Sequence, residues 1–198
     1  MTLNARLANY YQSLIGLLRW INEIGRIDIT TEVSMLATHM AMPREGHLFA
    51  VFRVFAYLKL KHNSKLVYDP TIPGVNVNDF KVDVDWTPFY GKVKEAIPTY
   101  PPKPLGKSVV LRLFVDSDHA GDQVTRRSRS GYVQMVNTSP INGYSKKKGS
   151  IEASKFGSEF VAIKTGIEAN HALRYKLRMM GILVDGPTYV YCDNMSVV

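Results

Sequence analysis

The stretch Phe114-Val115-Asp116-Ser117-Asp118 has the pattern of a hydrophobic strand that ends in carboxylates, and Tyr189-Val190-Tyr191-Cys192-Asp193 repeats this pattern later in the chain. A helical pattern that carries Glu159 lies between them. A strand, a helical crossover and a further strand in one sheet usually place the two strands side by side and parallel. If these strands pair, Asp116 and Asp193 emerge at the same edge of the sheet, ~4.8 Å apart across the ladder.

Further strand patterns surround the first stretch. Residues 109–115, 131–136 and 141–145 read as strands separated by Gly, Asn, Ser and Pro turn residues. They are short and close enough in sequence to form an antiparallel meander. The segment from 188 to 193 reads as a strand that returns to the sheet. The strand ending at Asp116 would then have a hairpin neighbour on one side and the later strand on the other, a switch point where open α/β sheets place their ligands.

Two helices are expected between these strands. In the first, from about residue 151, Phe156, Phe160, Ile163 and Ile167 recur at helical spacing and predict a core-facing stripe. At ~100° per residue, Glu159 lies about 75° from the centre of that stripe, on its flank. The second helix covers 172–180 and ends at Gly181, a residue suited to the left-handed conformation after a helix.

The patterns divide the chain into a helical segment at 1–69, a connection at 70–107 and an α/β domain at 108–198. Residues 9–68 predict two or three amphipathic helices. Prolines bound the connection, which has little helical periodicity and room for one short hairpin. The predicted fold class is α/β, with a mixed sheet and crossover helices preceded by a small α-helical segment.

Three carboxylates gathered so closely would repel one another unless a cation neutralised them. Asp116, Glu159 and Asp193 are therefore candidate metal ligands and catalytic residues. An all-oxygen site suits Mg²⁺ or Mn²⁺, and two such ions ~3.5–4 Å apart activate water and stabilise the leaving oxygen in phosphodiester hydrolysis. The predicted chemistry is that of a divalent-metal nuclease.

Taken singly, each of these residues has an ordinary explanation. An aspartate at the end of a strand is commonly a turn former, and a lone glutamate on a helix is commonly solvated. Glu152 also lies near the helix flank and is the alternative to Glu159. Cys192 follows the strand alternation and is expected to be a small buried side chain rather than a nucleophile.

Two basic clusters flank the expected site. Each lies next to a predicted strand and could grip phosphates by releasing counterions from nucleic acid, although soluble turns have the same composition. The net charge of +8 over 198 residues also favours a polyanionic partner, with nucleic acid ahead of a membrane surface. The candidate nucleic-acid-binding residues are Arg126, Arg127, Arg129, Lys146, Lys147 and Lys148.

Composition excludes several other classes of protein. A single cysteine cannot form an internal disulfide, and no apolar run approaches the ~18 residues that a membrane span requires. The first residues lack the basic and then apolar layout of a signal peptide. We therefore expect an intracellular chain without a membrane partner.

An ordered set of motifs resembles the RNase H domain of copia-type retrotransposon polyproteins. The set is Val115-Asp116-Ser117-Asp118-His119-Ala120-Gly121-Asp122, Arg127-Ser128-Arg129-Ser130-Gly131-Tyr132, Ser145-Lys146-Lys147-Lys148, Ser158-Glu159-Phe160 and Tyr191-Cys192-Asp193-Asn194. A weaker match over about 9–68 resembles the tail of the adjoining reverse transcriptase, through Tyr11-Gln12-Ser13-Leu14-Ile15-Gly16 and Val54-Phe55-Ala56-Tyr57-Leu58-Lys59.

The resemblance implies a metal-dependent hydrolase, an endoribonuclease that cleaves the RNA strand of an RNA–DNA hybrid. It assigns the metal to Asp116, Glu159 and Asp193, with water as nucleophile. It also implies the rest of a polyprotein as partner, and a place in the cytoplasm, the nucleus or a virus-like particle.

The chain departs from the family pattern at several points. Gly157-Ser158-Glu159-Phe160 stands where the family has Glu-Ala-Glu-Tyr, and no Tyr-x-Asp-Asp polymerase motif occurs. The sequence stops at Val198, before the further strand, helix and fourth acidic residue that the resemblance implies, so we expect a C-terminally truncated domain whose activity is in question. Two alternatives therefore stay open, a catalytically inactive remnant that binds nucleic acid and an aspartate-dependent phosphatase built on Asp116 and Asp118.

Overall fold

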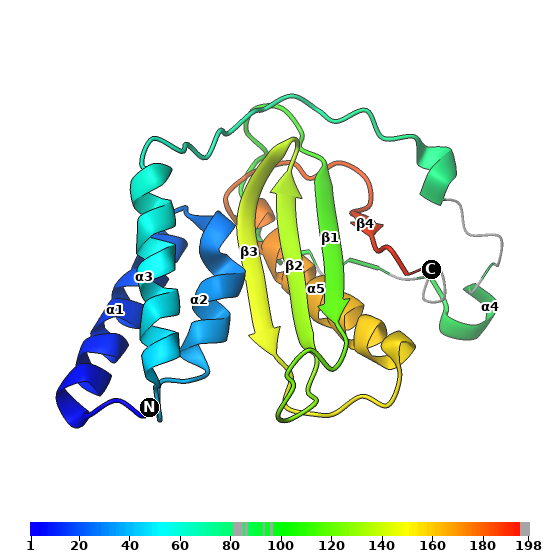
Figure 1. Cartoon of the computed structure of the whole chain (residues 1–198). Helices are drawn as coiled ribbons and strands as arrows, with labels where there is room; N and C mark the ends of the chain where they lie inside the picture. The colour runs from blue at the N-terminus through cyan, green and yellow to red at the C-terminus, as the bar shows by residue number, and fades with distance from the viewer. Residues whose placement is uncertain (81–84, 86, 93, 96, 195–198) are drawn as a thin grey trace.

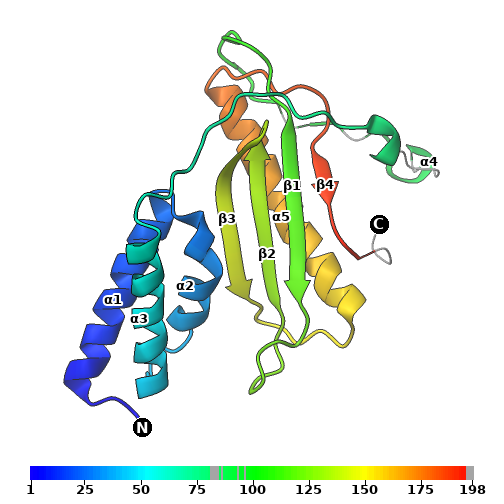
Figure 2. The ribbon, with the colours of Figure 1, turned by 45° about the horizontal axis from the view of Figure 1, so that its top comes forward.

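The computed structural model describes residues 1–80, 85, 87–92, 94–95 and 97–194. Within these residues, helices α1, α2 and α3 lie beside a mixed sheet, and the long helix α5 crosses one face of that sheet (Figure 1). Figure 2 shows the same layers from another side, with α2 next to the edge strand β3. The predicted α/β class, with a mixed sheet after a helical segment, is confirmed.

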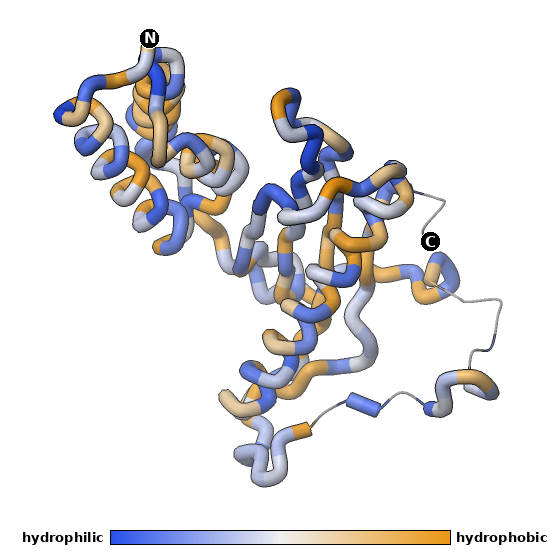
Figure 3. The backbone as a smooth tube through the Cα atoms, turned by 90° about the horizontal axis from the view of Figure 1, so that it is seen from below, coloured by the Kyte–Doolittle hydropathy of each residue, from blue (hydrophilic) through white to orange (hydrophobic). Residues whose placement is uncertain are grey.

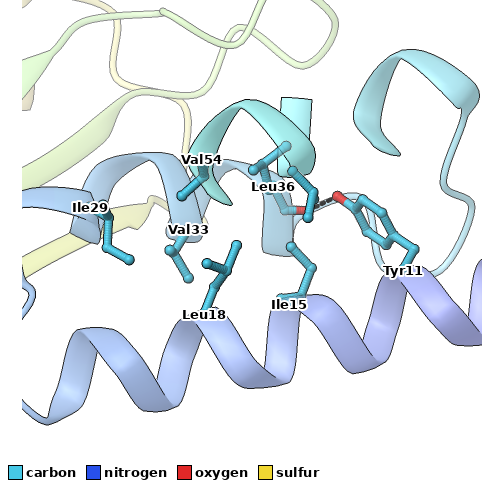
Figure 4. Close-up of a cluster of buried hydrophobic side chains, with 8 residues drawn as sticks. Tyr11, Ile15, Leu18, Ile29, Val33, Leu36 and Val54 are labelled. Atoms are coloured by element: carbon cyan, nitrogen blue, oxygen red, sulfur yellow. Dashed lines mark hydrogen bonds between the residues drawn. The ribbon is translucent and has the colours of Figure 1, made fainter. Parts of the chain in front are cut away.

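The N-terminal helices are α1 (Ala5–Glu23), α2 (Thr30–Ala37) and α3 (Glu45–Leu60), with a 3-10 turn at Ile27–Ile29. Two or three helices were predicted over 9–68, and this is confirmed. Their apolar faces pack into one core, which lies between α1 and the other two helices (Figure 4). Its buried members are Tyr11, Ile15, Leu18, Ile29, Val33, Leu36, Val51 and Val54.

The Tyr11 hydroxyl links α1 to the end of α2 inside this core. It donates a hydrogen bond to the carbonyl oxygen of Leu36 at 2.7 Å (Figure 4). Burial removes water from the phenol and raises the pKa of Tyr11 to about 12. The hydroxyl is therefore a neutral donor, and it adds a hydrogen bond to a carbonyl that also accepts the His39 amide at 3.1 Å.

Within the described residues, β1 (Leu111–Asp118), β2 (Arg129–Val136), β3 (Ser139–Lys147) and β4 (Tyr189–Tyr191) form one sheet in the order β3-β2-β1-β4. The strands β1, β2 and β3 pair antiparallel, and β4 pairs parallel to β1. The predicted meander and the predicted parallel pairing after a helical crossover are both confirmed.

The crossover is one continuous helix, α5 (Lys155–Met179), so the prediction of two helices was wrong. Asn170, a poor helix former, lies inside α5, where its side-chain amide donates to the Thr188 hydroxyl at 2.9 Å. This tertiary contact offsets the weak local preference for a break. Gly181 has φ +74°, and its predicted left-handed conformation after the helix is confirmed.

The buried face of α5 differs from the predicted stripe. Phe156 and Phe160 are 49% and 55% exposed, whereas Ala162 and Gly166 face the sheet. A Cβ atom on Gly166 would lie 3.0 Å from a Val115 methyl carbon, so only a glycine lets the helix approach this closely without displacing neighbours. The prediction that Phe156 and Phe160 face the core was wrong, because close packing of α5 on the sheet requires small side chains at the contact.

The connection between α3 and β1 contains a 3-10 turn at Val77–Phe80 and the short helix α4 (Thr87–Tyr90). No hairpin occurs in its described part, and residues 81–84, 86, 93 and 96 of the region lie outside the description. It is held to the α/β part where the Asp69 carbonyl accepts a hydrogen bond from the Ser139 hydroxyl. Glu95 anchors it again by ion pairs with Arg174 and Arg178 of α5.

The helices in the described part of the chain mix polar and apolar residues along their length. Figure 3 shows this as alternating blue and orange segments. None of these helices is both long and apolar enough to cross a membrane.

Candidate functional site

The strands β1 and β4 end side by side at one edge of the sheet. Their parallel register pairs Phe114 with Tyr191, and the two rings stack with centroids 4.6 Å apart. Asp116 and Asp193 each follow two residues later, so both leave the sheet at the same end of these strands. The carboxyl ends of β1 and β4 thus form the predicted switch point, because β1 continues into the β2 hairpin on its other side.

Glu159 reaches this point from the first turns of α5. The helix begins after Ser154, whose hydroxyl accepts the Gly157 amide at 3.0 Å. Glu159 is 0% exposed, at the centre of the buried face rather than on a flank as predicted. The physical reason is a rotation of the buried face of α5, which turns the two phenylalanines outward and this carboxylate inward while Ile163 still packs on the sheet.

The carboxylate of Glu159 is poorly satisfied. Its Oε1 atom is buried and has no hydrogen-bond partner among the described residues. Burial raises the pKa of Glu159, and the negative charges of Asp116 and Asp193 raise it further. Lys155 and Lys148 oppose that rise. A buried carboxylate with one unpartnered oxygen, beside two more carboxylates, is an arrangement that a cation would stabilise.

Among the described residues, Glu159, Cys192 and Asp193 each offer a ligand atom within 4.8 Å of the others. The Cys192 thiol lies 4.0 Å from Glu159 Oε2. Cys192 was predicted to be a small buried side chain, but it is half-buried and faces the acidic residues. Strand register could have found it, because Cys192 alternates with Tyr191 and therefore points to the α5 side.

Asp116 lies outside that close set of described residues. Along β1, burial alternates so that Val115 and Ser117 face α5 whereas Asp116 is exposed. Its Oδ1 atom accepts the Ser117 amide at 2.7 Å. The negative charge of Asp116 is near enough to raise the pKa of Glu159. Of the three predicted carboxylates, however, only those of Glu159 and Asp193 lie within 4.8 Å of each other.

Lys148 lies inside the molecule rather than on a rim. It is 9% exposed, and its ammonium donates a hydrogen bond to the Ser158 carbonyl oxygen at the start of α5. Burial lowers the pKa of Lys148, while the charges of Glu152 and Glu159 oppose that shift. The lysine therefore joins the end of β3 to the turn of α5 that carries Glu159.

Glu152, the alternative to Glu159, lies just before α5. It accepts a hydrogen bond from the Ser150 hydroxyl at 2.8 Å. Burial raises its pKa, but hydrogen bonds from Ser150 and Ser128 and the charge of Lys148 outweigh burial, so the pKa of Glu152 is lowered. Glu152 thus has a lowered pKa where Glu159 has a raised one, although Glu152 Oε2, like Glu159 Oε1, is buried without a hydrogen-bond partner among the described residues.

Some of the remaining basic candidates interact with other side chains, and the others are exposed to solvent. Arg129 donates to the Ser34 hydroxyl of α2 at 2.6 Å, and Lys147 forms a 2.8 Å ion pair with Asp122. Arg126 and Lys146 are exposed, and Arg127 is partly exposed. Lys146 and Lys147 also line a cleft of about 650 Å³ between the N-terminal helices and β3, together with Arg19 of α1.

Comparison with curated proteins finds relatives over most of the chain. The chain is 25% identical over 186 residues to a retrovirus-related Pol polyprotein from transposon RE1 of Arabidopsis thaliana, and 24% identical over 186 residues to its counterpart from transposon RE2. Each match covers 94% of the chain and 10% of the relative. A putative transposon Ty5-1 protein of Saccharomyces cerevisiae is 25% identical over 152 residues, 76% of the chain and 38% of the relative.

No family model matches the chain, and no solved structure matches it significantly. The chain spans about a tenth of the length of the two Arabidopsis relatives. The matches nevertheless extend through both the N-terminal helices and the α/β part, since they cover 94% of the chain. The resemblance drawn from the motifs is thereby confirmed: the chain is similar, over nearly all of its length, to a segment of retrotransposon Pol polyproteins.

Proposed function

We propose that the α/β part of the chain is an RNase H-like nuclease unit of a retrotransposon polyprotein, which cleaves the RNA strand of an RNA–DNA hybrid. The observation that carries the proposal is the buried Glu159 carboxylate, whose Oε1 atom lacks a hydrogen-bond partner among the described residues and which lies close to Asp193. The mixed sheet, with α5 connecting the parallel strands β1 and β4, is compatible with an RNase H-like fold.

Asp116, Glu159 and Asp193 would hold Mg²⁺ or Mn²⁺. Two ions are expected, because phosphodiester hydrolysis commonly uses a pair of metal ions. The donor set fits such ions, because burial and then the charges of Asp116 and Asp193 raise the pKa of Glu159, and a bound cation would offset both effects. The ions would supply Lewis-acid activation of water and stabilise the leaving oxygen. Packing of α5 on β1 fixes Glu159, which favours a preorganised site over one assembled on binding.

Binding of the hybrid would use the basic side chains that the fold leaves open. Arg126, Arg127 and Lys146 retain exposed surface, and the chain carries a net charge of +8. The stacked pair Phe114 and Tyr191 lies beside the carboxylates, with Phe114 38% exposed, and offers an apolar surface to a sugar or base. Phosphate contacts of this kind position a nucleic acid without reading its sequence.

The relatives suggest what surrounds this unit. Each is named as a Pol polyprotein or a transposon protein, and the chain covers 10% of the two Arabidopsis polyproteins. We propose that the rest of such a polyprotein is a partner of the chain. The N-terminal helices, which contact β3 through α2, would then join the nuclease unit to a preceding reverse transcriptase.

One observation favours the binding-only alternative. Asp116 is exposed and lies outside the close set formed by Glu159, Cys192 and Asp193 in the described chain. If Asp116 did not complete the site, the chain would bind nucleic acid through its basic residues without cutting it. Such binding would be independent of metal and would weaken steeply as salt rises.

Cleavage of a hybrid with labelled RNA, in Mg²⁺ or Mn²⁺, separates the two functions. We expect the full chain to cut the RNA strand, and Glu159→Gln to abolish cutting while leaving hybrid binding intact. Glu168→Gln is the matched control, because Glu168 lies on the same helix with a 67% exposed side chain. Intact RNA with the correctly folded wild-type chain, together with tight binding that does not need metal, would instead establish the binding-only function.

A further inference from the structure

Cys192 is the chain's single cysteine, and its surroundings are unusual for a structural thiol. It lies directly after β4, on the side of the sheet where α5 packs. Its thiol donates toward Glu159 Oε2 across 4.0 Å, a long and weak contact. Asp193 follows at once and brings a second carboxylate to the same place. The thiol thus has carboxylate oxygens as its polar neighbours.

A second observation points to a ligand at this position. Glu159 is fully buried, and its Oε1 atom has no hydrogen-bond partner within the described chain. A buried carboxylate oxygen in this state costs free energy unless something positive or a donor meets it. The ligand atoms of Glu159, Cys192 and Asp193 all lie within 4.8 Å of one another, so one ion could meet all three.

We propose that Glu159, Cys192 and Asp193 form a binding site for a thiophilic divalent cation, Zn²⁺ or Cd²⁺. Thiolate ligands select such ions, whereas Mg²⁺ prefers oxygen alone. Zinc lies about 2.3 Å from a thiolate and about 2.0–2.2 Å from a carboxylate oxygen, so the three ligand atoms would close by roughly an ångström. The Cys192 proton passes to solvent on binding, and water fills the remaining position.

Because Glu159 and Asp193 belong to both donor sets, the thiophilic cation would compete with Mg²⁺ or Mn²⁺. Zinc would therefore inhibit hybrid cleavage, and removal of the thiol would relieve that inhibition. This competition rests on the proposed nuclease function, but the binding does not. The two can be tested apart, since cadmium bound to a thiolate has an ultraviolet charge-transfer absorption that needs no substrate.

The test is a Cd²⁺ titration of the full chain, kept reduced with a phosphine, and followed by this absorption. Since the chain has one cysteine, the band reports Cys192 alone. The variants are Cys192→Ser, Glu159→Gln and Asp193→Asn, with Glu168→Gln as the exposed control on α5. Circular dichroism confirms the fold of each variant before titration.

We expect one equivalent of Cd²⁺ to produce the band in the wild-type chain and in Glu168→Gln, and no band in Cys192→Ser. Loss of either carboxylate should weaken binding about tenfold or more, the scale seen when groups supporting a metal are removed. Absence of the band in the wild type would overturn the proposal. So would equal affinity in the wild type, Glu159→Gln and Asp193→Asn, because a lone thiol would then account for the signal.

The nuclease proposal is judged by a separate result, Mg²⁺-dependent cleavage by the wild type without Cd²⁺. If cleavage fails and the cadmium band still depends on Glu159, the thiophilic site stands and the nuclease function falls. If cleavage succeeds and the band is absent, the reverse holds.

Discussion

The carboxylate of Glu159 lies within 4.8 Å of the carboxylate of Asp193, although the two residues belong to α5 and to the end of β4. Parallel pairing of β4 with β1 brings Asp193 to the edge where Asp116 also emerges. Close packing of α5 on β1 then places Glu159 near Asp193, on the side of the sheet that α5 covers. The acidic cluster is therefore a product of topology and helix packing, and changes to either should disturb it.

Gly166→Val should separate α5 from the sheet. Added side-chain atoms would meet Leu113 and Val115, which already lie 3.1 and 3.0 Å from where a Cβ would stand. We expect a loss of about 1–3 kcal/mol of stability, as for other overpacked cores. Gly16→Val is the control, because an added Cβ there has no atom within 4 Å. Urea unfolding measures both, and equal stability of the two variants would contradict the packing argument.

Lys148→Met should destabilise the chain, whereas Lys146→Met should not. The first removes a buried donor from the Ser158 carbonyl and a positive charge beside Glu159. Loss of a hydrogen bond from a charged donor costs about 1.5–3 kcal/mol. The second changes an exposed lysine two residues away, with an expected effect within about 0.5 kcal/mol. The free energies of unfolding of the two variants should therefore differ clearly, and similar values would argue against an interior role for Lys148.

Lys146→Ala should weaken hybrid binding without affecting stability. The side chain is exposed in the cleft between the N-terminal helices and β3, where a phosphate could approach. Loss of one phosphate contact should reduce the slope of log affinity against log salt by about 1. Fluorescence anisotropy over a range of salt concentrations measures the slope. An unchanged slope would place the hybrid elsewhere on the surface.

Glu95→Gln should remove part of the acid sensitivity of folding. Hydrogen bonds from Arg174 and Arg178 lower the pKa of Glu95 to about 2 from its ordinary value of 4.5. A lowered folded-state pKa stabilises the chain above pH 4.5, and this contribution is lost as pH falls from 4.5 toward 2. Since the Glu95 side chain stays 29% exposed, we expect a loss of only about 1 kcal/mol at pH 7.

Thermal or urea unfolding from pH 7 to pH 3 tests this expectation. The wild type and Glu95→Gln should converge in stability as the pH approaches 3, because the wild-type carboxylate then gains its proton more readily in the unfolded state. Curves that stay parallel over this range would show that the titration of Glu95 contributes no measurable stability.

The strand pairing could be predicted from the sequence because it follows from connectivity. A strand, a long helical crossover and a strand allow few arrangements, and the carboxylates at Asp116 and Asp193 then share an edge by register. The meander followed from the closeness of the strands in sequence, with residues 119–128 between β1 and β2 and residues 137–138 between β2 and β3. These features depend on chain order and on strand alternation, which a single sequence records directly.

The face of α5 and its length could not be read in the same way. Hydropathy favours Phe156 and Phe160 inside, but the distance between helix and sheet is set by Gly166 and Ala162, and a sequence does not record that distance. Tertiary contacts also determine which of the basic side chains are buried, paired or exposed. The consecutive lysines 146 to 148 look alike in the sequence, yet one is exposed, one is paired with Asp122 and one is buried.

The most direct test of the account is Mn²⁺ binding, followed by loss of the electron paramagnetic resonance signal of the free ion. Wild-type chain and Glu168→Gln should bind Mn²⁺ alike, and Glu159→Gln should bind it at least about tenfold more weakly because a buried ligand is lost. Equal Mn²⁺ binding by the wild type and a correctly folded Glu159→Gln variant would contradict the assignment of Glu159 as a cation ligand, and with it the proposed nuclease site.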